Sequence, residues 1–201
     1  MLIYASKIIG TRVLSVQAGG AIGEISKVIV DPNDLKVIAF RVGGGVVARS
    51  NANILDVSSI REYSSYGMVI DEIEELVEPE EVTKIKDVLD LNFDLIDLKV
   101  ETKKGSKLGK VIDFTMASED FMTQQIIVQR PTVKRLLDPE LTIPRGEIVE
   151  VTDYKIIVKD EEKVIRKKAE NEDFVPNFVN PFREPGFAPA DSQNPDESNI
   201  E

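Results

Sequence analysis

The reactive side chains of this sequence are limited to carboxylates, amines, hydroxyls and phenols. Its 201 residues include no Cys, no His and no Trp. Thiol nucleophiles, imidazole bases, disulfides and the usual zinc and haem ligands are therefore excluded. Carboxylates still leave a Mg²⁺ site open. We expect a protein that is not an enzyme and that carries no cofactor and no metal.

A hydrolase or transferase built on carboxylate and lysine is the minor alternative. Its nominal catalytic residues are Asp113, Lys110 and Tyr154. Each has a simpler structural role in a turn or at a barrel rim. The acidic run at residues 71–81 lacks the ordered ligand spacing of a calcium loop. We interpret that run as a solvated acidic edge.

Basic residues gather in two places in the second half of the chain. One cluster surrounds a predicted turn, and the other lies in a loop between Pro131 and Pro139. Either cluster suits phosphate or an acidic protein surface, although lysine-rich turns are also common on ordinary surfaces. No aromatic residues are interleaved for base stacking, which makes RNA the less favoured ligand. The candidate binding residues are Lys103, Lys104, Lys107 and Lys110 in the first cluster, and Arg130, Lys134 and Arg135 in the second.

The C-terminal segment, residues 170–201, combines signs of disorder with signs of binding. It holds five of the ten prolines, and it carries eight acidic residues against one basic residue. This composition predicts an acidic, disordered tail. Four of the eight Phe nevertheless lie here, and a merely solvating tail has little use for exposed aromatic rings.

The spacing of these aromatic residues predicts an extended docking peptide. Phe174, Phe178 and Phe182 are four residues apart, but Pro176 and Pro181 would break a helix that aligned them. We expect the three Phe to bind a groove. The groove belongs either to a partner protein or, intramolecularly, to the basic second repeat of the same chain.

The elements that position these residues occur twice. A glycine turn followed by a strand at residues 19–25 recurs at residues 105–111, and later apolar positions recur at offsets of 86 to 88 residues. Each copy is long enough to build a small core. We expect a first repeat at residues 1–78, a linker helix at 79–94, a second repeat at 95–169 and the tail at 170–201.

The patterns within each copy predict short strands joined by glycine turns. Closing such strands into a small barrel removes exposed edges. We therefore expect a mostly β protein with two small β-barrels in tandem and a short amphipathic helix over residues 79–89, placed at a barrel end or at the seam. The expected strands are residues 8–16, 22–30, 37–42, 45–48, 54–57 and 67–73 in the first repeat, and 98–102, 109–116, 124–129, 141–143 and 155–159 in the second.

The sequence resembles the PRC-barrel family, named for the cytoplasmic domain of the photosynthetic reaction centre H subunit and also found in a bacterial ribosome maturation factor. The motif is a turn glycine, then Gly-x-Val-x-Asp, an apolar strand and an apolar-Pro-x-x-x-Ile segment. In the second repeat it comprises Gly105, 109–113, 126–128 and 143–148. The first repeat matches at Gly20, 23–25, Asp31, 37–42 and Ile60, and it departs at Lys27 and Asp56, where Asp and Pro are expected.

The resemblance implies an adaptor that docks on proteins or assembling complexes, and it brings no catalytic residue. We expect a non-enzymatic interaction module without membrane insertion in the cytoplasm, because no stretch approaches the roughly 18 apolar residues of a membrane span. The alternative is an RNA-associated or ribosome-assembly factor. The second repeat would then bind the RNA, because its 15 basic and 13 acidic residues give it a net charge of +2 within a chain of net charge -11.

Overall fold

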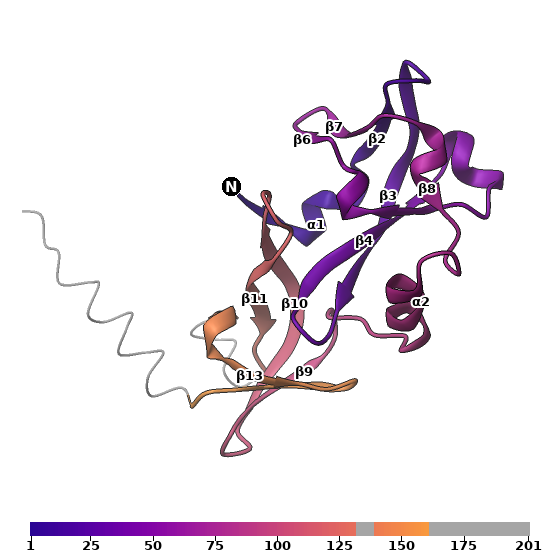
Figure 1. The fold of residues 1–201 in the computed structure, drawn as a ribbon. Helices are drawn as coiled ribbons and strands as arrows, with labels where there is room; N and C mark the ends of the chain where they lie inside the picture. Colours follow the sequence, from indigo (N-terminus) through magenta and orange to yellow (C-terminus); the bar gives the residue numbers. More distant parts are fainter. Residues whose placement is uncertain (132–138, 161–201) are drawn as a thin grey trace, which may run out of the picture. The chain divides into compact units, whose positions relative to one another are not determined.

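The fold is mostly β, as predicted. The computed structural model describes residues 1–131 and 139–160, which belong to one compact unit, residues 1–164. Two seven-stranded sheets make up this unit (Figure 1), and each sheet is built mainly from one of the two predicted repeats. Within the described residues, no helix is long and apolar enough to cross a membrane.

The first sheet contains seven strands of the first repeat and its immediate continuation. Their spatial order is β6-β7-β2-β3-β4-β5-β8. The long strands β3 and β4 pair antiparallel, whereas β2 and β7 pair parallel. The bounds are β2 Arg12–Ser15, β3 Gly20–Asp31, β4 Lys36–Gly43, β5 Ile54–Asp56, β6 Glu62–Ser64, β7 Gly67–Ile70 and β8 Leu76–Val77.

The second sheet repeats this plan and recruits the N-terminal strand. Its order is β12-β11-β10-β9-β14-β13, and β1 pairs with one end of β10. The first strand of the chain therefore belongs to the sheet of the second repeat. The bounds are β1 Leu2–Tyr4, β9 Lys99–Thr102, β10 Lys107–Ala117, β11 Thr123–Gln129, β12 Glu140–Pro144, β13 Ile148–Val151 and β14 Lys155–Val158.

The two sheets match strand by strand. Val13 pairs with Met68 across the parallel β2 and β7, and Val100 pairs with Ile156 across the parallel β9 and β14. The position of Asp56 opposite Ala39 corresponds to that of Pro144 opposite Gln125. This shared register confirms the internal repeat inferred from the spacing of apolar residues.

The motif glycines allow the long strand of each repeat to bend against its neighbour. A Cβ on Gly109 would lie 1.9 Å from the Gln129 carbonyl oxygen, and one on Gly23 would lie 2.9 Å from the corresponding oxygen of Gly43. Only glycine fits such a close backbone approach without displacement. A register shift follows each glycine, between Ile25 and Lys27 and between Val111 and Asp113.

The sheets end in short strands. No pairing joins β6 to β8 or β12 to β13 in the part of the chain that the structure describes, so the hydrogen-bonded paths stay open. These end strands span two to five residues. Such short edges offer little template for further pairing.

The linker contains the predicted amphipathic helix. It begins at Thr83 rather than Pro79 because a turn from Glu78 to Glu81 precedes it, and α2 spans Thr83–Asp90. Its buried residues Ile85 and Val88 cover β-sheet residues outside the main core, among them Ile38. The helix therefore packs on one face of the first sheet, and β4 is buried on both faces although a half-buried strand was predicted.

The predicted strand at residues 45–48 is wrong. This segment forms η1, a 3-10 helix at Gly45–Arg49. Gly44 and Gly45 both have positive φ angles, of 71° and 54°, which direct the chain out of the sheet. The remaining short helices are α1 Ala5–Ile8, η2 Val57–Ser59, η3 Ile73–Glu75 and η4 Arg145–Glu147.

A continuous hydrophobic core joins the two repeats. It includes Ile22 and Phe40 from the first sheet and Val111 and Ile126 from the second, all at most 1% exposed. The rings of Phe40 and Phe121 meet edge to face, with centroids 5.5 Å apart. Burying apolar surface in one shared cluster stabilises both sheets together.

Candidate interaction sites

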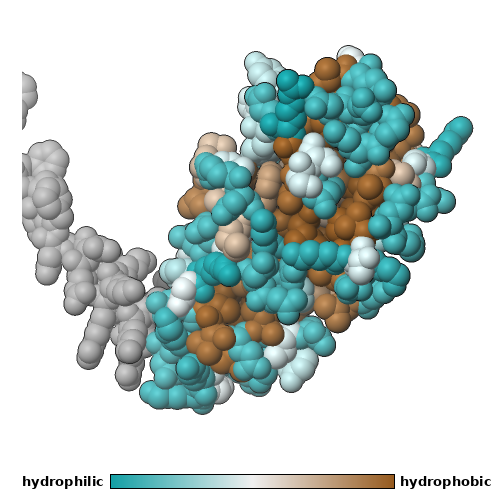
Figure 2. Space-filling view, in the orientation of Figure 1, coloured by the Kyte–Doolittle hydropathy of each residue, from teal (hydrophilic) through white to brown (hydrophobic). Residues whose placement is uncertain are grey.

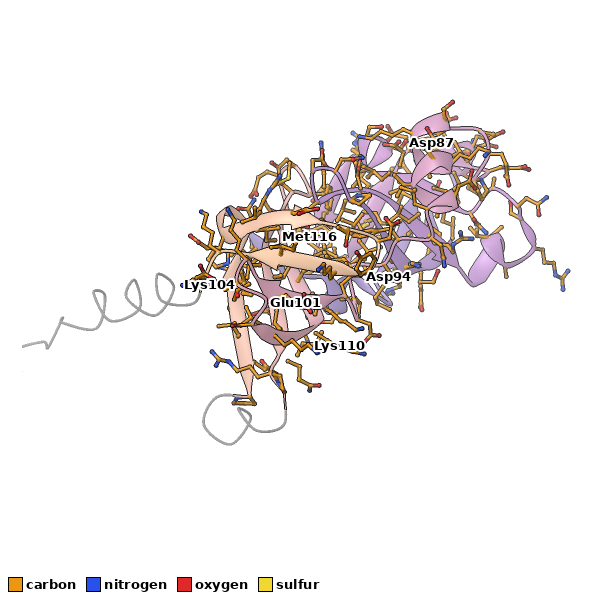
Figure 3. All side chains as sticks on the ribbon, turned by 90° about the horizontal axis from the view of Figure 1, so that it is seen from below. Asp87, Asp94, Glu101, Lys104, Lys110 and Met116 are labelled. Atoms are coloured by element: carbon orange, nitrogen blue, oxygen red, sulfur yellow. The ribbon has the colours of Figure 1, made fainter. Side chains whose placement is uncertain are left out.

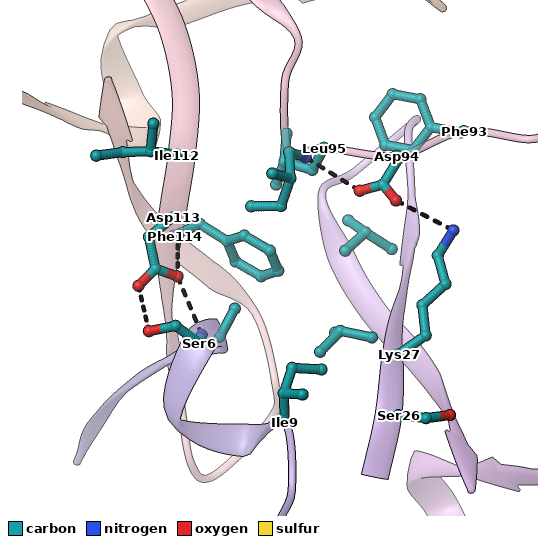
Figure 4. Close-up of a pocket in the computed structure, with 14 residues that line it drawn as sticks. Ser6, Ile9, Ser26, Lys27, Phe93, Asp94, Leu95, Ile112, Asp113 and Phe114 are labelled. Carbon is teal, nitrogen blue, oxygen red and sulfur yellow. Dashed lines mark hydrogen bonds and ion pairs between the residues drawn. The ribbon is translucent and has the colours of Figure 1, made fainter. Parts of the chain in front are cut away.

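A groove of about 310 Å³ lies where the two repeats meet, and we call it the inter-repeat groove. Its polar residues stand at the sides, while apolar side chains form its floor and rims (Figure 4). Figure 2 shows apolar surface bordered by hydrophilic side chains on one face of the molecule. The apolar lining includes Ile9, Val28, Phe93, Leu95, Ile112 and Phe114.

Asp113 joins the two repeats by hydrogen bonds at one side of the groove. Its carboxylate accepts hydrogen bonds from the Ser6 backbone N–H at 3.1 Å and the Ser6 hydroxyl at 2.5 Å, and from the Phe114 N–H at 2.8 Å. Ser6 belongs to α1, which precedes the first sheet, whereas Asp113 lies on β10 of the second. The acidic residue of the sequence motif therefore ties the leading segment of one repeat to the strand of the other.

Lys27 joins the two repeats by an ion pair at the opposite side of the groove. Its Nζ lies 3.1 Å from Asp94 Oδ2, and Asp94 Oδ1 accepts a hydrogen bond from the Ile96 N–H. Lys27 is on β3 of the first sheet, and Asp94 is in the segment that leads into the second. The two pairs, Asp113 with Ser6 and Lys27 with Asp94, are thus reciprocal, because each joins a strand of one repeat to the segment that leads into the other repeat.

This reciprocity accounts for the departure from the motif at Lys27. Lys27 and Asp113 follow the same register shift in their strands. The segment facing Asp113 presents a hydroxyl and an N–H, whereas the segment facing Lys27 presents a carboxylate. A basic residue at position 27 therefore complements its partner, where an aspartate would repel Asp94.

Two apolar side chains remain exposed on the rims of the groove. Ile9 is 47% exposed and Ile112 is 37% exposed, while Phe114 on the floor is 2% exposed. A volume near 310 Å³ is at the lower end of the range for ligand pockets, roughly 300–1,000 Å³. The groove is therefore suited to one or two apolar side chains of an approaching segment.

A second feature is a row of lysines across three strands of the second sheet, which we call the lysine row. Lys110 on β10 is directly opposite Lys99 on β9, and Lys99 is in register with Lys155 on β14. Residues in register share one face of a sheet. Like charges directly opposite one another are destabilising, so the lysine row is electrostatically unfavourable without a counter-charge.

Counter-charges near the lysine row are incomplete. Lys155 Nζ lies 3.4 Å from Glu101 Oε2, and Lys107 is also opposite Glu101. Within residues 1–131 and 139–160, no acidic group lies within ion-pair distance of Lys99, Lys107 or Lys110. A hollow of about 360 Å³ beside the row is lined by these three lysines and by Arg130.

The structure places the predicted basic residues on different features. Lys107 and Lys110 lie on β10, and Arg130 follows β11. Lys103 and Lys104 lie in the turn before β10, and Figure 3 labels Lys104. Lys104 forms an ion pair with Asp160. The remaining predicted binding residues, Lys134, Arg135, Phe174, Phe178 and Phe182, lie outside the described residues.

The nominal catalytic residues lie on three different features. Asp113 is engaged with Ser6, Lys110 belongs to the lysine row, and Tyr154 is 66% exposed in the turn between β13 and β14. Lys155 Nζ lies 5.9 Å from the centre of the Tyr154 ring. Asp113 and Tyr154 thus have structural contacts, whereas Lys110 is placed only by its register opposite Lys99.

The acidic run at residues 71–81 interacts locally. Asp71 pairs with Arg61 at 2.6 Å, and this contact raises the pKa of the Arg61 guanidinium. Glu78 donates its N–H to a carboxylate oxygen of Glu81. Over the ranges that the structure describes, no group of three or more acidic side chains is arranged to hold a metal ion.

Sequence reasoning missed Ser6, Phe93 and Asp94 of the groove and Lys99 and Lys155 of the lysine row. The two leading segments carry little periodic signal. Lys99 corresponds to Arg12 when the two repeats are aligned by their strand register. Arg12 is opposite Glu24, whereas Lys99 is opposite another lysine.

The family assignment follows from a match to the sequence model of the PRC-barrel domain over residues 1–77. This part of the chain is a PRC-barrel domain. The second repeat copies the strand register of that PRC-barrel domain around the shared core. A search of curated proteins found no match to the chain. PRC-barrel domains generally mediate protein interactions.

Proposed function

We propose that the protein is a non-enzymatic adaptor whose inter-repeat groove binds an extended segment of a partner protein carrying an aromatic side chain. The groove is the observation that carries the proposal. It combines a floor of buried Phe93 and Phe114 with rims of exposed Ile9 and Ile112. An aromatic ring that enters such a site would bury apolar surface both of the ring and of the groove.

The polar residues of the groove favour a peptide ligand. Lys27 and Asp94 at one side and Asp113 at the other are held by hydrogen bonds or ion pairs. Their fixed positions leave the apolar floor open between them. An extended segment can insert a ring into the floor while its backbone passes between these polar groups.

The non-enzymatic assignment is supported by composition and by geometry. The full sequence lacks His and Cys, so acid-base or nucleophilic catalysis would depend on carboxylate, lysine or tyrosine groups. Two of the candidates have contacts that account for them without catalysis, Asp113 with Ser6 and Tyr154 with Lys155.

The proposal is tested by peptide binding to the full chain. A labelled peptide with the sequence of residues 172–183 serves as the model ligand, because it carries three Phe separated by prolines. Ile112→Asp places a charge on the groove rim, where it would meet the entering ring. We expect this change to weaken binding at least tenfold in fluorescence anisotropy, since burying an unpaired charge is costly.

Val149→Asp is the matched control. Val149 is similarly exposed, at 45%, but it lies on β13 outside the lining of the groove. It should leave peptide affinity unchanged. Equal affinity of the two variants and the native chain would contradict binding in the groove. Turnover of a substrate by the purified chain would contradict the non-enzymatic assignment.

A further inference from the structure

We propose that the lysine row, together with Lys107, is a binding site for a carboxylate-rich segment of a partner protein. This surface is separate from the inter-repeat groove, and the inference does not depend on it. Lys99, Lys110 and Lys155 are in register on three adjacent strands, and a buried residue follows each of them, so their side chains leave the outer face of the sheet. Neighbouring strands are about 4.8 Å apart, so three ammonium groups are anchored within roughly 10 Å.

The described part of the chain does not neutralise the lysine row. Glu101 lies 3.4 Å from Lys155 Nζ through its Oε2 atom, and it is also opposite Lys107. Lys99 and Lys110 form no ion pair within residues 1–131 and 139–160. Like charges directly opposite one another repel, so an added carboxylate would relieve this repulsion and also attract both lysines.

The first repeat shows that the fold does not impose this imbalance. Glu24 on β3 faces Arg12 on β2, and their charges cancel. At the corresponding places of the second repeat, Lys110 on β10 faces Lys99 on β9. The residue on the other side of Glu24 and of Lys110 is uncharged in both sheets. The first repeat thus supplies from its own strand the carboxylate that the second repeat lacks.

Several cations of this surface can engage one ligand at the same time. Exposed ion pairs are individually weak, so useful affinity requires several carboxylates on one segment. Lys107 lies on β10 three residues before Lys110, and both lysines line a hollow of about 360 Å³ with Lys99. Four lysines and one glutamate therefore share this part of the sheet. An acidic segment that crosses β10, β9 and β14 would place successive carboxylates against them.

Charge favours an acidic protein segment over nucleic acid as the ligand. The whole chain, with the basic residues at 163–168 included, has a net charge of -11, which repels a long phosphate backbone. A short acidic segment responds mainly to the lysines that it touches, because exposed charges more than about 10 Å apart are screened at 0.1 M salt. Tyr154 beside Lys155 is an exposed ring of the kind that stacks on bases, so the experiment includes RNA as the competing ligand.

The test measures binding of a labelled octaglutamate peptide to full-length chains at low salt. Lys99→Gln with Lys110→Gln should weaken binding roughly tenfold, because two cations without a partner in the described residues are removed. Arg49→Gln with Lys86→Gln is the matched control, since both residues are exposed outside the second sheet and the net charge changes equally. Every chain keeps residues 163–168, so a difference between variants reports on the lysine row.

Lys110→Glu separates loss of the site from loss of folding. It places a carboxylate opposite Lys99, as Glu24 is opposite Arg12, so octaglutamate binding should fall at least tenfold while the protein stays as stable as the native chain. Equal octaglutamate affinity of the native chain and the lysine-row variants would overturn the site, as would an equal loss in the control pair. Tighter binding of octauridine RNA than of octaglutamate to the native chain would overturn the assigned ligand class.

Discussion

The two repeats share one backbone plan but present different chemistry at corresponding positions. At the groove, the first sheet contributes Lys27 and the second contributes Asp113, and each contacts the leading segment of the other repeat. At the central strand pair of each sheet, Arg12 on β2 faces Glu24 on β3, whereas Lys99 on β9 faces Lys110 on β10. Register and glycine positions are thus kept, while charge differs at the groove and at the central strand pair.

The comparison is most sharply tested at the motif glycines. Gly109→Ala should destabilise the protein by roughly 3 kcal/mol or more, since its Cβ would overlap the Gln129 oxygen at a φ of 145°. Gly23→Ala should cost only about 1–2 kcal/mol, because the overlap is milder and φ is not positive. Urea unfolding followed by circular dichroism measures both. Equal losses of stability in Gly109→Ala and Gly23→Ala would contradict this difference between the repeats.

A smaller difference in stability loss is expected between variants of Asp113 and Lys27, the two residues that link the repeats at the sides of the groove. Asp113→Ala removes an acceptor of three hydrogen bonds and should cost roughly 1–2 kcal/mol. Lys27→Ala removes an exposed ion pair and should cost less than about 0.5 kcal/mol. The free energies of unfolding in urea check the order. A larger loss of stability for Lys27→Ala than for Asp113→Ala would contradict the stronger structural role given to Asp113.

Asp31 in the first repeat should contribute to the acid sensitivity of the protein. Burial raises the pKa of Asp31, but hydrogen bonds from Asn33 and Lys84 outweigh it, so the folded pKa lies below its ordinary value. The carboxylate therefore contributes stability that is present above the unfolded pKa near 3.9 and is lost as pH falls through the folded pKa. Asp31→Asn should flatten the stability profile below about pH 4.

Ala117 provides the comparison for Asp31, since it ends β10 where Asp31 ends β3. The second repeat has no carboxylate at this place. Thermal unfolding from pH 2 to 6 measures the contribution of Asp31. An unchanged slope in Asp31→Asn would place the acid-sensitive group elsewhere.

The smallest expected effect concerns the charged residues that face one another across the central strands of each sheet. Lys110→Glu would create opposite charges across from Lys99 and should stabilise the protein by about 0.5 kcal/mol at low salt. Glu24→Lys would create like charges across from Arg12 and should destabilise it by a similar amount. Both effects should shrink in 1 M salt, as unfolding measurements would show. Destabilisation by Lys110→Glu would mean that Lys110 already has a favourable partner.

The repeat and most strands were predictable because local patterns determine them. Apolar spacing and turn glycines indicated β3, β4, β10 and β11 close to their observed bounds. The strands β1, β6, β8 and β13 were missed, because segments of two to four residues carry too little periodicity. The helix η1 was mistaken for a strand, because two positive φ angles at glycines do not appear in hydropathy.

The candidate sites were less predictable because they depend on register and on contacts between repeats. The lysine cluster near residues 103–110 was evident, but the row with Lys99 and Lys155 required the pairing of three strands. The groove requires Ser6 to meet Asp113, 107 residues away. No local pattern encodes a contact of that separation.

The most direct test of the account is methyl NMR of the full chain titrated with the 172–183 peptide. The account predicts selective shifts of the Ile9, Val28 and Ile112 methyls, with contacts from these methyls to a peptide Phe ring. Val46 and Val149, exposed outside the lining of the groove, should not shift. Shifts at Val46 or Val149 without shifts at Ile112 would contradict the groove as the binding site.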